Sequence, residues 1–528
     1  MAMTTPPHLD QLTAEQLRQL AAQLLADAAE KEHTIAQQGQ TIAQQGHQLK
    51  RHQLLNDKLT HELAILKRHR FGKSSEGLDS HQASLLDELV DADIAAIEVT
   101  LSEPVASVGA TSAPEKRQPK RVPLPPTLPR TIIAHEPDHT ECRCGCQLQR
   151  IGEDISEKLD YTPGTFTVER HVRGKWVCKH CERLTQVPVP AQIIDKGLPT
   201  SGLLADLLIA KYADHLPLYR QERIFARAGL GIARSTLADW VGRCGVALQP
   251  LADALRETLL TQPVLHADET PVPMLSPGKK KAHRAYIWAY CSPTTAALHA
   301  VVYDFAENRA GANARTFLEG WQGKLVCDDY SGYKAGFQTG ITEIGCMAHA
   351  RRKFYDLHTA NKSQIAEQAL RLIQQLYEIE REANALCADE RQRLRQHRSK
   401  PILNSLHQWL MTHRQKVPNG SATARAIDYS LKRWQALIRY CEDGAVPMDN
   451  NQVENQIRPW ALGRSNWLFA GSLRSGQRAA AIMSLIQSAK LNGHDPYAYL
   501  RDVLQRLPTQ KNNAIDELLP HHWKPDAV

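Results

Sequence analysis

Apolar positions follow a heptad period near the start of the chain. Residues 11–70 are predicted to form one long helix, in which the stretch TIAQQG occurs at 34–39 and again at 41–46, one heptad apart. The seam that continues this repeat consists of Ile35, Ile42, Leu49, Asn56 and Leu63. A single asparagine in such a seam can fix the register between paired helices and the number of helices in the coiled coil. We therefore expect a coiled-coil-like arm over residues 10–75 that self-associates. The alternative is a helix that packs on its own protein, because the glycine in each repeat lowers helix stability.

A period of two residues appears after a polar stretch. Residues 76–130 are predicted to be a short acidic helix followed by a linker rich in Pro, Ser, Ala, Lys and Arg. From Ile155 to Val177 the sequence alternates like two strands joined near Pro163 and Gly164. This pattern predicts a small β module over residues 131–195.

Five cysteines bracket the predicted hairpin. Cys178 and Cys181 form a Cys-x2-Cys knuckle, and the stretch ECRCGCQL contains Cys142, Cys144 and Cys146. Four thiolates on two such turns make a closed tetrahedral zinc site, which is structural rather than catalytic. We expect a zinc ribbon that binds Zn²⁺ through four of the five cysteines, with the histidine inside the knuckle as a less favoured substitute. The alternative is a set of buried cysteines without metal.

Helical periodicity begins near residue 196. The stretch RIFARAGLGIARSTLADWV contains a helix, a turn at Gly229 and a second helix, which is the order of a helix-turn-helix motif. The second helix would carry Arg234, Ser235 and Thr236 at its N-terminus, where recognition helices meet DNA. We expect a helical DNA-binding region over residues 196–260, and an ordinary helical hairpin is the alternative.

Strands and helices then alternate in a way that predicts an α/β domain over residues 261–355. The expected strands are Pro263–Ala267, Ala285–Cys291, Ala296–Tyr303, Lys324–Cys327 and Thr342–Cys346. The expected helices are Ala310–Gly320, before the fourth strand, and one that begins at His349, after the fifth. This order is that of an RNase H-like domain. Asp268 follows the first expected strand directly and Asp328 follows the fourth.

Carboxylates at the ends of adjacent strands can share one or two divalent cations, and hard oxygen ligands suit Mg²⁺ or Mn²⁺. Such ions activate an attacking oxygen and stabilise the leaving oxygen of a phosphodiester. The third candidate acid is Glu454, within DNNQVENQIRP at 449–459, where amides surround the carboxylate and Arg458 lies one helical turn later. The alternative is an exposed helix N-terminus that is capped by Asp449 or Asn450.

A long insertion separates Glu454 from the preceding part of the predicted core. Residues 356–446 are mostly helical and basic, most clearly in RQRLRQHRSK at 391–400. Such a run can lie against DNA, although a solvated charged face is the commoner outcome. The core is expected to resume over residues 447–500, and residues 501–528 form a C-terminal tail. The whole chain is thus expected to be a multidomain α+β protein.

Composition is consistent with this organisation. A chain of 528 residues is too long for one hydrophobic core. The net charge of +7 and a pI near 8.8 mildly favour a polyanionic partner. The polar start from Met1 to Asp10 and the absence of a long apolar run predict a cytoplasmic protein with no membrane partner. Clustered cysteines favour a reduced compartment.

Several long motifs carry a resemblance to a known family. They are HADETP, CDDYSGYK, CMAHARRKF, DNNQVENQIRPWALGRSNWLFAGS and SLIQSAKLNGHDPYAYL, together with LKRHRFGKSSEG and the cysteine module nearer the start. Over nearly the whole chain these stretches resemble the large-subunit, DDE-type transposases of the insertion sequence 66 family. The resemblance implies an RNase H-like DNA transposase with a zinc-binding module and a helical insertion.

The same resemblance implies a catalytic triad of Asp268, Asp328 and Glu454, which would also hold Mg²⁺. Family members often carry glycine where this chain has Asp329, so Asp328 and Asp329 stay open as the second acid, with Asp328 favoured because it lies at the strand end. The first cysteine cluster also departs from a plain Cys-x2-Cys pair, which leaves its two zinc ligands open.

The leading hypothesis is an enzyme that cuts and joins the DNA ends of a bacterial insertion sequence. Arg351, Arg352 and Arg458, together with His349, are candidates for phosphate contacts or for orienting the acids. The expected partners are the terminal repeats, target DNA, a second copy of the chain and accessory proteins of the same element. The alternatives are a non-catalytic zinc and helix-turn-helix DNA-binding regulator, and a nuclease without strand transfer.

Overall fold

The computed structural model describes residues 124–137 and 147–525, except 163, 196 and 276–281, together with positions 56, 59, 60, 63 and 97. The chain divides into a unit of residues 1–65 and a unit of residues 66–528. In the first unit the four described positions are helical. Most of the predicted arm, almost all of the predicted linker, and Cys142, Cys144 and Cys146 lie outside the described residues.

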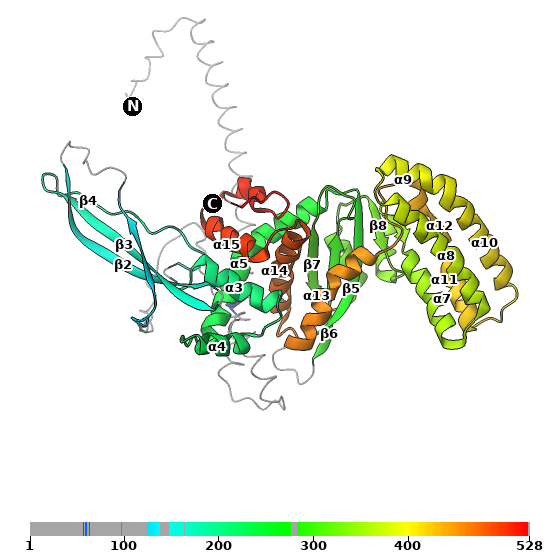
Figure 1. Ribbon diagram of the computed structural model, residues 1–528, viewed down its shortest axis with the longest axis horizontal. Helices are drawn as coiled ribbons and strands as arrows, with labels where there is room; N and C mark the ends of the chain where they lie inside the picture. Colours follow the sequence, from blue (N-terminus) through cyan, green and yellow to red (C-terminus); the bar gives the residue numbers. More distant parts are fainter. Residues whose placement is uncertain are drawn as a thin grey trace, which may run out of the picture. The chain divides into compact units, whose positions relative to one another are not determined.

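The β module of the second unit is a long twisted hairpin (Figure 1). Its strands are β1 Arg130–His135, β2 Leu148–Thr162, β3 Thr165–Cys178 and β4 Leu184–Thr185. The order is β1-β3-β2, with β4 paired to β3. Gly164, with φ +87°, lies in the tight turn between β2 and β3, where glycine avoids the strain of a side chain. The two strands expected from the alternation are therefore confirmed.

Three helices follow the hairpin, as the apolar periodicity predicts. They are α3 Ser201–Tyr212, α4 Leu218–Arg227 and α5 Arg234–Leu259. The side chain of Thr200 caps α3 by accepting the N–H of Leu203 at 3.2 Å. Gly229, with φ +90°, forms the turn between α4 and α5, so this pair has the helix-turn-helix order that the sequence predicts.

A five-stranded mixed sheet lies at the centre of the second unit (Figure 1). Its strands are β5 Val264–Met274, β6 His283–Cys291, β7 Val301–Ala306, β8 Lys324–Cys327 and β9 Thr342–Gly345. The order is β7-β6-β5-β8-β9, in which β7, β6 and β5 are antiparallel and β8 and β9 run parallel to β5. Helix α6 Gly311–Phe317 and the short 3-10 helices η2 Ser331–Tyr333 and η3 Gly336–Gln338 flank β8 along the chain.

Two strand boundaries differ from the sequence-based prediction. The first strand does not end at Asp268, because β5 continues to Met274 by pairing with β6. The third strand begins at Val301 rather than Ala296, because residues 293–299 form a loop. Ser292 closes that loop: its N–H donates to the carbonyl of Ala300 at 3.1 Å, and its hydroxyl accepts the N–H of Ala300 at 3.1 Å.

Both faces of the central sheet are buried. In β8, Leu325 and Cys327 belong to one hydrophobic core, whereas Val326 between them belongs to a second. The first core includes α5 and α14 Leu473–Leu491, and the second includes α7 Met347–Asn361 and the helices that follow it. Burial on both sides explains why residues 325–327 of β8 are a continuous apolar run rather than an alternating one.

Residues between α7 and α13 form a helical bundle (Figure 1). Its elements are α8 Gln364–Ala383, α9 Ala388–Leu394, a π-helical turn η4 Arg395–Ser399, α10 Lys400–Arg414, α11 Ala422–Lys432, α12 Trp434–Ile438 and η5 Arg439–Glu442. The basic run at 391–400 does not form a wholly solvated face. Arg391 and Arg395 are buried, whereas Arg393 and Arg398 are exposed.

The chain then returns to the central sheet. The last helices are α13 Asn451–Trp467, α14, α15 Pro496–Arg506, η6 Leu507–Thr509 and η7 Asn512–Leu518. Helix α13 packs against β5 and β6, and α14 packs against β7 and α5. Among the described residues, the helices are too short or too polar to cross a membrane.

Candidate active site

Asp268 and Asp328 come together because β5 and β8 are parallel neighbours. The paired residues are Val264 to His266 in β5 and Lys324 to Val326 in β8. Both aspartates lie two residues beyond this paired stretch. Their carboxylate oxygens and one from Glu269 lie within 4.8 Å of one another. We call Asp268, Glu269 and Asp328 the acid cluster.

Each aspartate of the cluster is held by a backbone amide. The N–H of Glu269 donates to Oδ1 of Asp268 at 2.9 Å, and the N–H of Tyr330 donates to Oδ1 of Asp328 at 2.9 Å. In the part of the chain that the structure describes, no lysine or arginine forms an ion pair with either carboxylate. The two aspartates therefore face one another, and the arginine beside them, Arg309, pairs directly with Glu269 instead.

Burial raises the pKa of Asp268 to about 8, and the negative charges of Glu269, Asp328 and Glu454 add to this effect. The backbone N–H of Glu269 opposes it. The ionised form of Asp268 is thus destabilised unless a cation is present, since neighbouring carboxylates disfavour a further negative charge. The hard oxygen donors of the acid cluster fit a divalent cation such as Mg²⁺ or Mn²⁺.

Glu454 reaches this region through a buried asparagine that the sequence analysis treated only as a possible cap. Asn450 precedes α13 and is fully buried. Its Nδ2 donates to the carbonyl of Ala267 at 2.9 Å, its Oδ1 lies 2.9 Å from Nδ1 of His266, and its backbone N–H donates to Sγ of Cys346 at 3.2 Å. Asn450 therefore joins the start of the Glu454 helix to the strand that carries Asp268.

The carboxylate of Glu454 is not part of the acid cluster. It faces α7, where Oε1 lies 3.9 Å from Nδ1 of His349 and Oε2 lies 3.6 Å from Arg352. Oε1 of Glu454 and Nδ1 of His349 are both buried without a hydrogen-bond partner. An unsatisfied carboxylate oxygen is costly, and a bound cation would relieve that cost. Of the three predicted acids, the structure thus gathers two and places the third beside basic groups.

Asp329 has different partners from Asp328. Its carboxylate lies 3.7 Å from Nζ of Lys334 and 3.7 Å from Nε of Arg433. Arg433 comes from the helical bundle and also donates to Glu343 at 2.6 Å. Asp329 thus has cationic partners and lies outside the acid cluster, whereas Asp328 lies within it.

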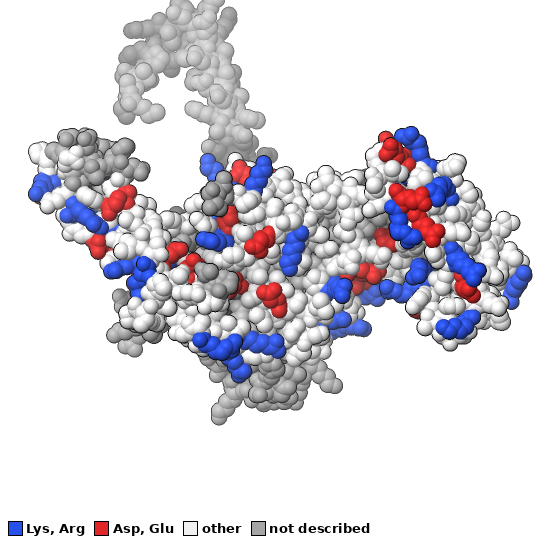
Figure 2. All heavy atoms as spheres, viewed as in Figure 1, with Lys and Arg blue, Asp and Glu red and all other residues white. Residues whose placement is uncertain are grey.

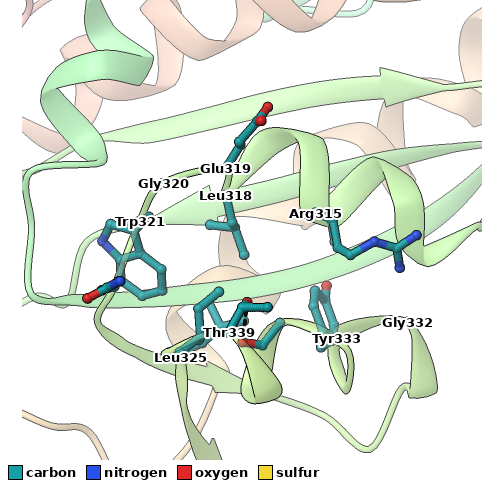
Figure 3. Close-up of a pocket in the computed structure, with 13 residues that line it drawn as sticks. Arg315, Leu318, Glu319, Gly320, Trp321, Leu325, Gly332, Tyr333 and Thr339 are labelled. Carbon is teal, nitrogen blue, oxygen red and sulfur yellow. Dashed lines mark hydrogen bonds between the residues drawn. The ribbon is translucent and has the colours of Figure 1, made fainter.

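Glu269 and its partners were missed by the sequence analysis. The carboxylate accepts hydrogen bonds from Arg309 through Oε1 and from the hydroxyl of Tyr333 through Oε2, the latter at 2.9 Å. Tyr333 also lines a cavity of about 270 Å³ between α6 and the η2–η3 segment, with Leu318 and Trp321 on its walls (Figure 3). The only local signal was the acidic pair in HADETP, and the sequence could not show which acid faces which partner.

The remaining predicted DNA contacts lie on three helices. Ser235 is exposed in the first turn of α5, and Arg234 and Thr236 are half-buried beside it. Arg351 and Arg458 are exposed on α7 and α13. Figure 2 shows basic side chains over α4 and along the boundary between α13 and the helical bundle. The predicted DNA contacts therefore include positively charged side chains that are exposed to solvent.

The described half of the cysteine module has the geometry of a turn. Cys178 ends β3, and its carbonyl accepts the N–H of Glu182 at 2.8 Å, which brings the chain back toward Arg183 and β4. Leu148, two residues after Cys146 in sequence, pairs with Cys178. Cys178 is buried and Cys181 is exposed. The two thiols therefore lie on a knuckle next to the strand that follows the first cysteine cluster.

Comparison with known proteins places the chain among transposases. A model described as "Transposase IS66 family" matches residues 196–478. Further matches are the "IS66 C-terminal element" at 484–521, the "zinc-finger binding domain of transposase IS66" at 139–182 and the "Transposase C of IS166 homeodomain" at 58–133. Because the first match covers more than half of the chain, the protein belongs to the IS66 transposase family. The resemblance seen in the sequence motifs is thus confirmed.

Two curated relatives come from Sinorhizobium fredii. The uncharacterized protein y4qI is 38% identical over 493 residues, which cover 89% of this chain and 89% of the relative. The uncharacterized protein y4jD is 36% identical over 486 residues, which cover 88% of this chain and 94% of the relative. The similarity therefore extends over nearly the full length of both proteins.

Proposed function

We propose that the protein is a DDE-type transposase that cuts and joins the DNA ends of a bacterial insertion sequence, with Asp268, Asp328 and Glu454 as its catalytic acids. The observation that carries this proposal is the convergence of Asp268 and Asp328 from parallel strands in a member of a transposase family. In the first step a water oxygen attacks phosphorus and the bond to the 3′ oxygen breaks. In the second step the freed 3′-hydroxyl attacks a target phosphodiester and displaces its 3′ oxygen.

We further propose that the catalytic core is RNase H-like. Three antiparallel strands followed by two parallel ones, in the order β7-β6-β5-β8-β9, support this assignment. So does the position of the acids, since Asp268 lies on the central strand β5 and Asp328 directly follows its neighbour β8.

The chain's own residues prepare this site in two ways. A divalent cation, Mg²⁺ or Mn²⁺, held by Asp268 and Asp328 with Glu454 nearby would supply Lewis-acid polarisation of the scissile phosphate. The backbone amides of Glu269 and Tyr330 fix the orientation of the two aspartates. The exposed Arg352, at 3.6 Å from Glu454, lies where it can bind a phosphate and orient that acid.

DNA binding by the other regions forms part of the same proposal. We assign DNA contact at the start of α5 to Arg234, Ser235 and Thr236. Helix α5 is the second helix of the α4–turn–α5 pair, which has helix-turn-helix order. We assign Arg351 and Arg458 to phosphate contact, since both are exposed, Arg458 on the helix α13 that carries Glu454 and Arg351 on the helix α7 that its carboxylate faces. Pairing of two element ends would come from self-association of the arm at residues 10–75, with accessory proteins of the element as further partners.

The test uses a labelled DNA duplex that carries the inverted repeat flanking the coding region, with Mg²⁺. Wild-type protein should nick the end and join it to target DNA, whereas Asp268→Asn, Asp328→Asn and Glu454→Gln should each lose both steps and still bind the duplex. Asp329→Asn is the matched control, because this acid has Arg433 and Lys334 as partners. Normal cleavage by any of the first three variants removes that residue from the proposed triad.

A non-catalytic regulator is the second candidate, favoured by the zinc-finger match at 139–182 and the α4–α5 arrangement. It predicts DNA binding without cleavage, and it makes the acid cluster expendable. A nuclease without strand transfer would cut the labelled end but leave no joined product. The same duplex assay therefore separates all three functions.

Zinc is proposed as a structural ion of the cysteine module. Four-ligand coordination predicts about one zinc per chain by metal analysis of purified protein. The double variant Cys178→Ser, Cys181→Ser should lose this zinc and become sensitive to protease near residues 135–195, while the central sheet keeps its resistance. Fully active wild-type protein without zinc would contradict the assignment.

A further inference from the structure

Arg309 lies in the loop between β7 and α6, and that loop is held by its own hydrogen bonds. The side chain of Asn308 accepts the N–H of Ala310 at 2.9 Å. The side chain of Asn313 in α6 donates to the carbonyl of Asn308 at 2.8 Å. The hydroxyl of Tyr330 donates to the carbonyl of Arg309 itself. The backbone that carries Arg309 is therefore fixed relative to the segment after Asp328.

The guanidinium of Arg309 is ordered and accessible at the same time. Its Nε donates to Oε1 of Glu269 at 2.7 Å, and a terminal nitrogen donates to the same oxygen. The group also stacks over the ring of Tyr330, 4.0 Å from the ring centroid. The Arg309 side chain nevertheless remains 43% exposed. An arginine held in this way has little conformational entropy left to lose when it binds a ligand.

Glu269 has the opposite character, because its side chain is fully buried. One oxygen accepts from Arg309 and the other from the Tyr333 hydroxyl. A carboxylate with both oxygens in strong hydrogen bonds is better suited to anchoring its partners than to joining a metal shell. Its place in the acid cluster thus brings the positive charge of Arg309 next to Asp268 and Asp328.

We propose that Arg309 binds a phosphate of the DNA strand held at the acid cluster, and that Glu269 is a positioning residue for Arg309 rather than a further metal ligand. This inference rests on the proposed DNA-cutting function. A site with several carboxylates repels the phosphates of its substrate, so a cation at its edge lowers the cost of approach. Arginine suits this role because its planar fork can donate to a carboxylate and a phosphate at once.

The first experiment measures binding without cleavage. The full chain is titrated with the fluorescent terminal-repeat duplex in Ca²⁺ over a series of KCl concentrations. Plotted as log affinity against log salt concentration, the data give a negative slope. In Arg309→Gln the magnitude of this slope should be smaller by about 0.9, because one phosphate contact is lost. Affinity at physiological salt should fall about tenfold, as expected for one hydrogen bond to a charged group.

A matched control comes from the helical bundle. The Arg398 side chain is 44% exposed and forms a similar ion pair with Glu382, yet that pair lies outside the acid cluster. Arg398→Gln should leave the salt slope unchanged. If Arg309→Gln and Arg398→Gln behave alike, Arg309 is not a specific phosphate contact.

The second experiment separates positioning from metal binding by Glu269. In single-turnover cleavage, Glu269→Gln should weaken DNA binding and leave the Mg²⁺ concentration for half-maximal rate unchanged. The double variant Glu269→Gln, Arg309→Gln should be no worse than Arg309→Gln alone, because both changes remove one interaction. It also avoids leaving a buried carboxylate without its partner, so it serves as the folding control.

Three outcomes overturn the inference. A tenfold or greater increase in the Mg²⁺ requirement of Glu269→Gln, with an unchanged salt slope, would make Glu269 a metal ligand. A wild-type salt slope and cleavage rate in Arg309→Gln would remove the phosphate contact while leaving the proposed transposase function intact. Wild-type protein that neither binds nor cuts the duplex would remove both proposals together.

Discussion

The arginines of the candidate site and those of the helical bundle have opposite surroundings. Arg352 and Arg309 are 60% and 43% exposed in their side chains and face carboxylates of the candidate site. Arg391 and Arg395 are only 7% and 2% exposed and bind mainly backbone carbonyls. The comparison teaches that arginines of a basic run in a helical insertion can be buried and stabilise the bundle, rather than form a DNA-binding face.

Arg395 shows what a buried arginine does for the bundle. It donates to the carbonyls of Tyr440, Asp443 and Val446, and it forms an ion pair with Glu380 at 2.6 Å. Carbonyls near the end of a helix have no partner within that helix, so another group must bind them. Arg395 supplies this group and holds the segment that returns the chain toward α13.

The largest expected effect is on the stability of the bundle. Arg395→Gln leaves Glu380 without its charge partner and several buried carbonyls without a donor, so the free energy of unfolding should fall by about 3–5 kcal/mol. Urea unfolding followed by tryptophan fluorescence measures this change. Arg393→Gln, an exposed neighbour in the same run, is the control and should unfold like wild type. Equal stability of the two variants would remove the distinction between buried and exposed arginines.

The next effect concerns the link between the Glu454 helix and β5. Asn450→Ala removes a donor to Ala267 and a partner of His266, which should lower the free energy of unfolding by about 1–3 kcal/mol. Cleavage of the labelled end should fall about 100-fold, because a small displacement of a catalytic group has a cost of that order. Asn451→Ala, at an exposed position, should change neither quantity. Normal cleavage by Asn450→Ala would show that this contact does not position Glu454.

Beside Glu454, activity and stability should separate. Arg352→Gln removes an exposed cation, so the free energy of unfolding should stay within about 0.5 kcal/mol of wild type. Cleavage should nevertheless fall about tenfold, as expected for loss of one charge-assisted hydrogen bond. Parallel unfolding and single-turnover measurements test this pattern. A large loss of stability with unchanged cleavage would make Arg352 resemble Arg395.

The smallest effect is expected on the outer face of the bundle. Arg398 and Glu382 form an exposed ion pair, and such pairs contribute little because solvent screens them. Arg398→Gln should leave the unfolding midpoint, DNA affinity and cleavage at wild-type values. A clear drop in DNA affinity would instead assign DNA contact to the outer face of the basic run.

Local patterns predicted much of the fold. Periodicity and turn residues act over short distances, so the sequence predicted several elements correctly. They are the strands around the Gly164 turn, the strand Lys324–Cys327 and the helices on both sides of Gly229. The end of β5 could not be predicted from the sequence. Its continuation past Asp268 depends on pairing with β6, and short-range alternation carries no information about that partner.

By itself, the sequence determined the family and the residue types of the site: acids after apolar strands, amides around Glu454 and cysteines on a knuckle. Only the tertiary structure decided which of these residues meet. Asn450 binds His266 across 184 residues of chain, Glu269 binds Arg309, and Asp329 lies beside Arg433 from the bundle. Long-range contacts are set by how whole layers pack. Two adjacent acids such as Asp328 and Asp329, equivalent in composition, therefore acquire different surroundings only when the chain has folded.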